Sequence, residues 1–89
     1  MIKNFYDAVA DEMENLLTKN NIEYTRKPIY EGWQFYIHGT DGDIVCHRGS
    51  YGGYNGLWES MGFDWDEEDV TGYLTAQEVV SRLKEYYGM

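Results

Sequence analysis

Near the start of the chain, apolar residues recur at the spacing of an amphipathic helix. They are Phe5, Tyr6, Val9, Met13, Leu16 and Leu17, with Asp7, Asp11, Glu14 and Thr18 on the opposite side. Asn4 can cap the first turn together with Asp7, and the pair Asn20-Asn21 can adopt the left-handed turn that ends a helix. The pattern therefore predicts a helix over residues 4–19.

Three segments in the middle of the chain have the alternation or composition of β-strands. They are residues 22–27, 33–39 and 43–48. The dipeptide Asp41-Gly42 lies between the last two and is a strong signal for a two-residue hairpin loop. With these two residues as the loop, Thr40 faces Asp43 and Tyr36 faces His47. We therefore expect a three-stranded antiparallel meander.

This register divides the two hairpin strands into a buried and an open face. The face expected toward the core carries Trp33, Phe35, Ile37, Ile44 and Cys46. The other face carries Gln34, Tyr36, His38, Val45 and His47. We expect both histidines to be exposed to solvent beside Tyr36.

The second half of the chain begins with a glycine-rich loop, residues 49–56. We expect Asn55 to start a short helix that runs through Trp58 to Met61, followed by an acidic and aromatic connector over residues 63–69. Thr75 and Glu78 form the capping box of a last helix, which Gly88 ends. The predicted fold is α+β in the order α-β-β-β-(short α)-α, with the two long helices on one face of the sheet.

Composition narrows the classes of function. The chain has 89 residues, which fits one domain over residues 1–89, and its single cysteine, Cys46, points to a reducing compartment. No apolar stretch reaches the length of a membrane span and no signal peptide is evident, so we expect a cytoplasmic protein. A formal net charge of −9 disfavours nucleic acid and anionic lipid as ligands and favours a basic protein surface. Alternatively, the charge only keeps the protein soluble.

No motif for catalysis, a cofactor or a metal is present. Cys46 and His47 are neighbours on a strand and point to opposite faces, and the acidic run after Gly62 lacks the glycine and glutamate of a calcium loop. We therefore predict that the protein is not an enzyme and holds no cofactor or metal. The glycine-rich loop lacks the spacing and lysine of a P-loop, but Arg48 and Ser50 leave small-ligand or nucleotide binding by residues 49–56 open as an alternative.

The same loop has the tyrosine, serine, glycine and asparagine composition of an antibody paratope. The connector that follows supplies carboxylates that can steer a basic partner. The predicted partner-binding residues are Tyr51, Tyr54, Asn55, Trp58, Asp64, Asp66, Glu67, Glu68 and Asp69. Two alternatives remain at this point: Trp58 can instead anchor the loop to the core, and the connector can be a solvated acidic segment.

In size, charge and element order, the whole chain resembles the small acidic α+β proteins that phages and other mobile elements encode, among them anti-CRISPR and other anti-defence inhibitors. The resemblance implies stoichiometric inhibition of a nuclease or other defence protein, with carboxylates in the place of nucleic acid phosphates. It also implies the host cell cytoplasm as the location. We expect a monomer or homodimer that binds a protein with a basic surface and neither nucleic acid nor membrane directly.

Overall fold

The computed structural model describes residues 4–67 and 69–89. Among these residues are two α-helices, five β-strands and one turn of 3-10 helix. In chain order they are α1 (Phe5–Lys19), β1 (Tyr24–Ile29), β2 (Gly32–Ile37), β3 (Asp43–Cys46), η1 (Gly53–Asn55), β4 (Trp58–Met61), β5 (Val70–Leu74) and α2 (Ala76–Tyr87). The strands form one antiparallel sheet in the order β1 to β5. The predicted α+β class is confirmed, and the meander has five strands instead of three.

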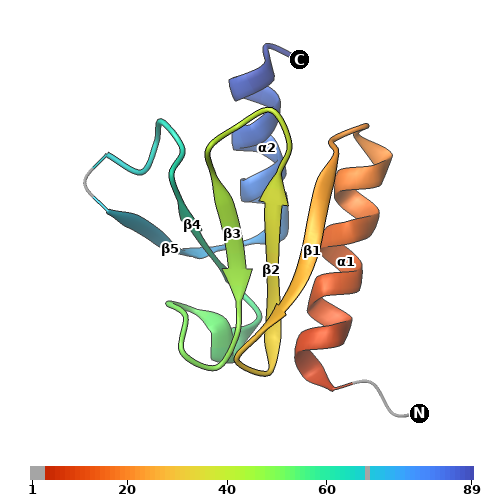
Figure 1. Ribbon diagram of the computed structural model, residues 1–89, viewed down its shortest axis with the longest axis vertical. Coiled ribbons are helices and arrows are strands. Elements are labelled where there is room, and N and C mark those ends of the chain that lie inside the picture. Colours follow the sequence, from red (N-terminus) through yellow and green to blue (C-terminus); the bar gives the residue numbers. More distant parts are fainter. Residues whose placement is uncertain (1–3, 68) are drawn as a thin grey trace.

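Both helices lie against the same face of the sheet (Figure 1). The core side chains come from the inner sides of the helices and from every second strand residue. Phe35 pairs with Ile44 across β2 and β3, and the rings of Phe35 and Trp58 are nearly perpendicular, with 5.5 Å between their centres. The predicted core face is confirmed, because Phe35, Ile37, Ile44 and Cys46 are at most 2% exposed. Trp33, at the margin of the core, is half-buried.

The predicted capping boxes are present at the starts of both helices. Asn4 Oδ1 accepts a hydrogen bond from the Asp7 amide (2.8 Å), and Thr75 Oγ1 accepts one from the Glu78 amide (3.1 Å). At the end of α2, Gly88 adopts a left-handed conformation (φ 71°).

The acidic side of α1 turns toward the edge of the sheet. Arg26 on β1 donates to Asp11 (3.0 Å) and Glu14 (3.2 Å), and its guanidinium lies 4.0 Å from the ring centre of Trp33. The indole N–H of Trp33 donates to Asp7 (2.7 Å). These contacts tie α1 to the first two strands.

The two-residue hairpin of this sheet is Tyr30-Glu31, between β1 and β2. Both residues are left-handed, with φ of 43° and 69°, as a type I′ turn requires. The flanking residues Ile29 and Gly32 then form a hydrogen-bonded pair, so Pro28 turns its nitrogen away from β2. A proline is tolerated there because β1 is an edge strand.

The prediction that Asp41-Gly42 forms a two-residue hairpin was wrong. The loop covers residues 38–42, its left-handed residue is Gly39 (φ 80°), and the Thr40 hydroxyl donates to the carbonyl of Ile37 (2.8 Å). Tyr36 consequently faces Asp43 instead of His47. The shift covers an even number of residues, so the core face and the open face were still assigned correctly.

The prediction of a short helix through Trp58 to Met61 was also wrong, since these residues form β4. Trp58 and Ser60 point into the core and Glu59 and Met61 point out, an alternation too short to distinguish from a helical turn in sequence. The open edge of β3 is paired by this segment, and β5 then follows the connector.

The hairpin geometry can be tested at Glu31. We expect Glu31→Gly to raise the free energy of unfolding by about 0.5–1 kcal/mol, because a left-handed non-glycine residue costs about 1–2 kcal/mol and the freedom of glycine in the unfolded chain offsets part of the gain. Urea denaturation measures the change. Glu31→Ala keeps the strain and should bring no gain, so equal stability of the two variants would contradict the turn.

Candidate functional site

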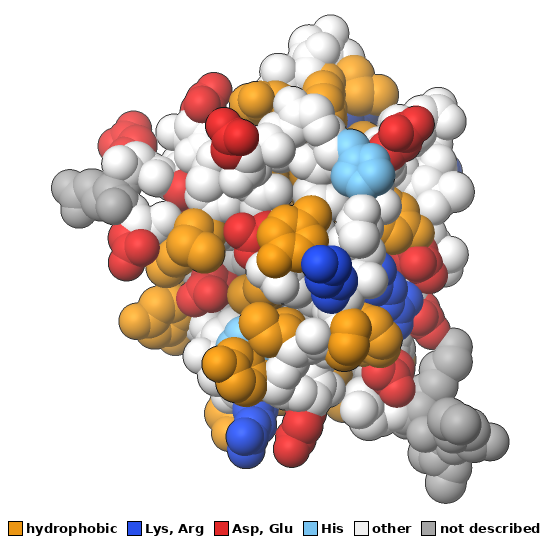
Figure 2. All heavy atoms as spheres, viewed as in Figure 1, with side chains coloured by type: hydrophobic (Ala, Val, Ile, Leu, Met, Phe, Trp, Pro, Cys, Tyr) orange, Lys and Arg blue, Asp and Glu red, His pale blue; other side chains and the backbone are white. Residues whose placement is uncertain are grey.

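The face of the sheet opposite the helices is open and carries exposed aromatic side chains. Among the described residues, four tyrosines that are 42–66% exposed lie on this side together with one half-exposed methionine. We call this group the tyrosine face: Tyr30, Tyr36, Tyr51, Met61 and Tyr73. Figure 2 views the molecule from this side and shows hydrophobic side chains across it, with most acidic side chains toward its margins.

Cross-strand pairing fixes the middle of this face. One row of neighbours runs across four strands through Tyr36, Asp43, Met61 and Val70. A second row consists of Lys27, Gln34, Val45 and Glu59. The Gln34 amide donates to Asp43 (3.0 Å), and the Lys27 ammonium lies 5.4 Å from the ring centre of Tyr36. The face therefore mixes aromatic, acidic, amide and ammonium groups.

Two of the tyrosines occupy strained backbone positions. Tyr30 (φ 43°) and Tyr73 (φ 59°) are both left-handed, which costs a non-glycine residue about 1–2 kcal/mol. The Tyr30 ring lies 5.3 Å from the ring of His47, and the Tyr73 amide donates to the carbonyl of Tyr51 (3.2 Å). Such strain is concentrated at functional sites in proteins. Here the two strained positions carry exposed rings that lie on the tyrosine face.

Tyr51 extends from the glycine-rich loop onto β5. Its ring lies 6.4 Å from the ring of Tyr73, and its amide donates to Glu59 (3.4 Å). Gly72 provides the space, because a Cβ atom there would lie 2.5 Å from the Cβ of Tyr51. Tyr51 and Tyr73 thus form a paired ridge at one edge of the tyrosine face.

The four residues predicted in the loop are not brought together. Tyr51 joins the tyrosine face, whereas Tyr54 and Asn55 are exposed in η1. The end of η1 lies toward α1, because a Cβ atom at Gly56 would lie 3.0 Å from the Phe5 ring and 3.2 Å from Val9. Trp58 is 0% exposed in the core, the alternative role that the sequence left open.

The backbone of the glycine-rich loop is occupied by internal hydrogen bonds. The N–H groups of residues 49, 50, 51, 53, 55, 56 and 57 donate to acceptors within the protein. The Ser50 hydroxyl donates to the carbonyl of His47 and accepts from its amide, both at 3.0 Å. A phosphate cradle needs amides that point at the ligand. The geometry therefore does not favour the nucleotide-binding alternative.

Asp66 in the predicted connector is a structural acceptor. It accepts hydrogen bonds from the hydroxyls of Ser60 (2.8 Å) and Thr71 (2.5 Å) and from the amide of Phe63 (3.2 Å). The indole N–H of Trp65 donates to the same Ser60 hydroxyl (2.8 Å). This network folds the connector over one end of β4.

The remaining connector carboxylates differ from Asp66. Asp64, Glu67 and Asp69 are exposed, and Glu68 lies outside the described residues. The connector and the glycine-rich loop lie at opposite ends of β4 (Figure 1). The structure thus separates the two halves of the predicted site.

His47 is 9% exposed, so the expectation that it faces solvent was wrong. It lies opposite Gly32, and the Gly49 amide donates to its Nδ1 (3.0 Å). Burial lowers the pKa of His47, while Glu59 acts in the opposite direction. His38 is exposed at the other end of the sheet, where its Nε2 lies 2.7 Å from the Thr25 hydroxyl.

The thiol and the possible metal ligands form no reactive centre within the described residues. Burial raises the pKa of Cys46 to about 11, so the thiol is neutral near pH 7 and a poor nucleophile. In residues 4–67 and 69–89, no three histidine, cysteine, aspartate or glutamate side chains are grouped to hold a metal ion.

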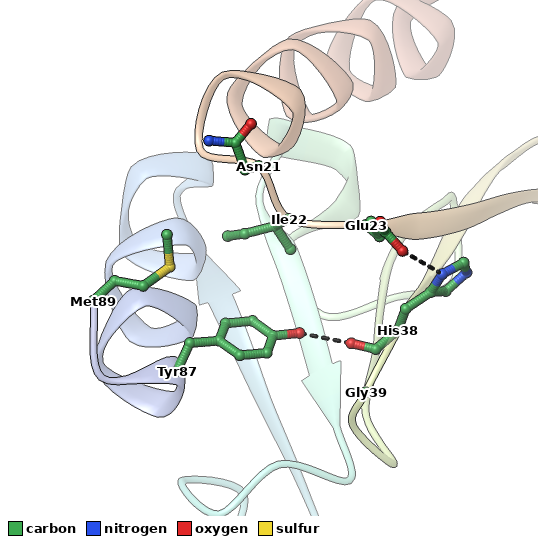
Figure 3. A pocket seen from close by; sticks show the side chains of 7 residues that line it. All are labelled: Asn21, Ile22, Glu23, His38, Gly39, Tyr87 and Met89. Carbon is green, nitrogen blue, oxygen red and sulfur yellow. Dashed lines mark hydrogen bonds and ion pairs between the residues drawn. The ribbon is translucent and has the colours of Figure 1, made fainter.

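A shallow pocket lies where both helices end (Figure 3). It has a volume of about 390 Å³ and is lined by Asn21, Ile22, Glu23, His38, Tyr87 and Met89. The Tyr87 hydroxyl donates to the carbonyl of His38 (2.7 Å), and Glu23 Oε2 lies 3.7 Å from His38 Nδ1. Sequence reasoning missed this pocket because three separate segments form it.

Comparisons with protein-family models, curated proteins and solved structures gave no significant match. No helix within the described residues is long and apolar enough to cross a membrane. The candidate site therefore rests on its own geometry and chemistry.

The role of Asp66 can be measured against Asp64. We expect Asp66→Ala to lower the free energy of unfolding by about 2 kcal/mol, because the largely buried Ser60 and Thr71 hydroxyls lose their acceptor. Asp64→Ala makes the same chemical change at an exposed position and should alter it by less than about 0.5 kcal/mol. Chemical denaturation of both variants tests the network, and similar losses would argue against it.

The burial of His47 predicts a pH dependence of stability. Its pKa is lowered in the folded state, so stability is retained above the ordinary histidine pKa of 6.5 and is lost as the pH falls below it, where the unfolded chain binds the proton more readily. Urea denaturation at about pH 7.5 and about pH 5.5 brackets this range. The loss should be smaller in His47→Gln and unchanged in His38→Gln. The reverse order would show that His38 carries the effect.

Proposed function

We propose that this protein binds another protein through the tyrosine face. The observation that carries the proposal is the presentation of four exposed tyrosines on one open sheet face, two of them at strained backbone positions. Tyrosine is enriched among the residues that dominate binding energy at protein interfaces, since it offers a large, rigid and amphipathic surface. A set of exposed rings held in place at a cost in stability supports a role in recognition.

The partner that we propose presents a basic surface. The net charge of −9 attracts such a partner over a distance, and Asp43 and Glu59 lie among the tyrosines to pair with it at short range. The exposed carboxylates Asp64, Glu67 and Asp69 lie in the loop that joins β4 to β5. These groups support faster association, whereas the aromatic rings support slow dissociation.

The combination of tyrosines and carboxylates supports a stoichiometric inhibitor as the biological role. A protein that ordinarily binds nucleic acid has a basic groove, and an acidic surface with aromatic anchors can occupy it in place of phosphates and bases. The resemblance to anti-defence inhibitors agrees with this role and narrows the partner to a nuclease or another defence protein.

Alanine substitutions at two exposed tyrosines test the surface. The wild-type protein, Tyr36→Ala and Tyr54→Ala are used as bait in the source lysate, and the retained protein is purified for surface plasmon resonance. Tyr36→Ala should weaken binding by about 2 kcal/mol, roughly thirtyfold, mainly through faster dissociation. Tyr54→Ala removes a ring outside the tyrosine face that is more exposed than Tyr36 (79% against 42%) and should change the affinity little.

The outcomes separate the alternatives. A loss of binding in Tyr54→Ala alone would show that the partner binds the glycine-rich loop instead of the tyrosine face. An affinity that does not change with salt concentration would exclude a basic partner. If the wild-type bait retains no protein beyond the bare matrix, protein binding itself is contradicted.

A further inference from the structure

The pocket of Figure 3 lies at the C-terminal ends of both long helices. The helix α1 ends at Lys19 and α2 at Tyr87, and both ends lie at the same end of the molecule (Figure 1). The left-handed residues that follow them, Asn21 (φ 58°) and Gly88 (φ 71°), turn the chain across this end. The C-terminus of a helix carries a partial negative charge, so both helices make this end attractive to cations.

A carboxylate adds a full negative charge at the rim of the pocket. Figure 3 shows the Glu23 side chain directed toward His38, and the two groups are 3.7 Å apart. Thr25 lies 2.7 Å from the other ring nitrogen of His38 and fixes the orientation of the imidazole. The described residues that line the pocket include neither lysine nor arginine. A positively charged ligand would therefore meet Glu23 without a competing lysine or arginine in the lining.

The rest of the lining is apolar and aromatic. Figure 3 shows Ile22, Met89 and the ring of Tyr87 around the same space. The hydrogen bond from the Tyr87 hydroxyl to the carbonyl of His38 holds the ring in place. A ring face attracts cations, and the aliphatic groups can cover an apolar body. The volume of about 390 Å³ is within the range of about 300–1,000 Å³ that is typical of small-molecule sites.

We propose that this pocket binds a small organic cation: a primary ammonium group carried on an apolar body. The ammonium group lies at Glu23 and the helix ends, and the apolar body lies against Ile22, Tyr87 and Met89. The pocket shares no residue with the tyrosine face, so this site is independent of the proposed protein-binding function.

Three ligands with similar apolar bodies test the charge requirement. The probes are 2-phenylethylamine, the neutral 2-phenylethanol and the anionic 3-phenylpropionate, each titrated into the full chain labelled with ¹⁵N. The titrations are run at about pH 8, where histidines are ordinarily neutral. The amine should give saturable amide shifts at residues 21–23, 38–39 and 87–89, the alcohol weaker ones, and the anion none. Equal shifts with all three probes, or saturable shifts of the amine confined to the tyrosine face, would overturn the proposal.

A matched pair of charge-removing variants tests the position of the ammonium group. Glu23→Gln should weaken amine binding about two- to fivefold, the effect expected from losing one exposed ion pair. Glu12→Gln removes the same charge from an exposed position in the middle of α1 and should leave the affinity unchanged. The spectrum of each variant without ligand shows whether it is folded. An equal loss of affinity in both variants would show that the effect comes from net charge alone and would contradict a site at Glu23.

Discussion

Phe35, Ile44 and Trp58 are fully buried against two helices that cover only one face of the sheet. Because side chains alternate along a strand, burial of this set places the residues between them on the open face. Those positions hold Tyr36, Glu59 and other side chains that can be exposed to solvent and can also contact a partner. One-sided burial thus determines both the core and the candidate binding surface, and a third layer on the open face would remove the latter.

The parts of the fold that depend on local chemistry could be predicted from sequence. The capping residues fixed the starts of both helices, and strand alternation assigned Phe35 and Ile44 to the core. The two-residue hairpin was predicted at Asp41-Gly42 because this dipeptide is favoured in such turns. The left-handed turn is instead formed by Tyr30-Glu31, and neither residue is favoured in this conformation. A strained backbone conformation that the surrounding structure stabilises cannot be predicted from the local preferences of its residues.

The candidate site was less predictable, because its residues gain their positions from tertiary contacts. Tyr36 was placed on the open face by alternation alone, but the position of Tyr73 depends on a bulge in β5, a strand that the sequence did not reveal. Asp66 resembled its exposed neighbours in sequence, yet the hydroxyls of Ser60 and Thr71 make it part of the structure. The charge of a segment does not show which of its carboxylates are free to attract a partner and which accept hydrogen bonds within the fold.

The order of the strands has a consequence for how the chain folds. Each strand pairs with the next one in sequence, so every pairing closes a short loop and the sheet can form by successive local steps. The contact between α1 and α2 joins the two ends of the described chain and is the most non-local step. During synthesis, the apolar face of the sheet has no complete cover until α2 is made. Docking of α2 therefore completes the protection of a growing chain against association through its uncovered core.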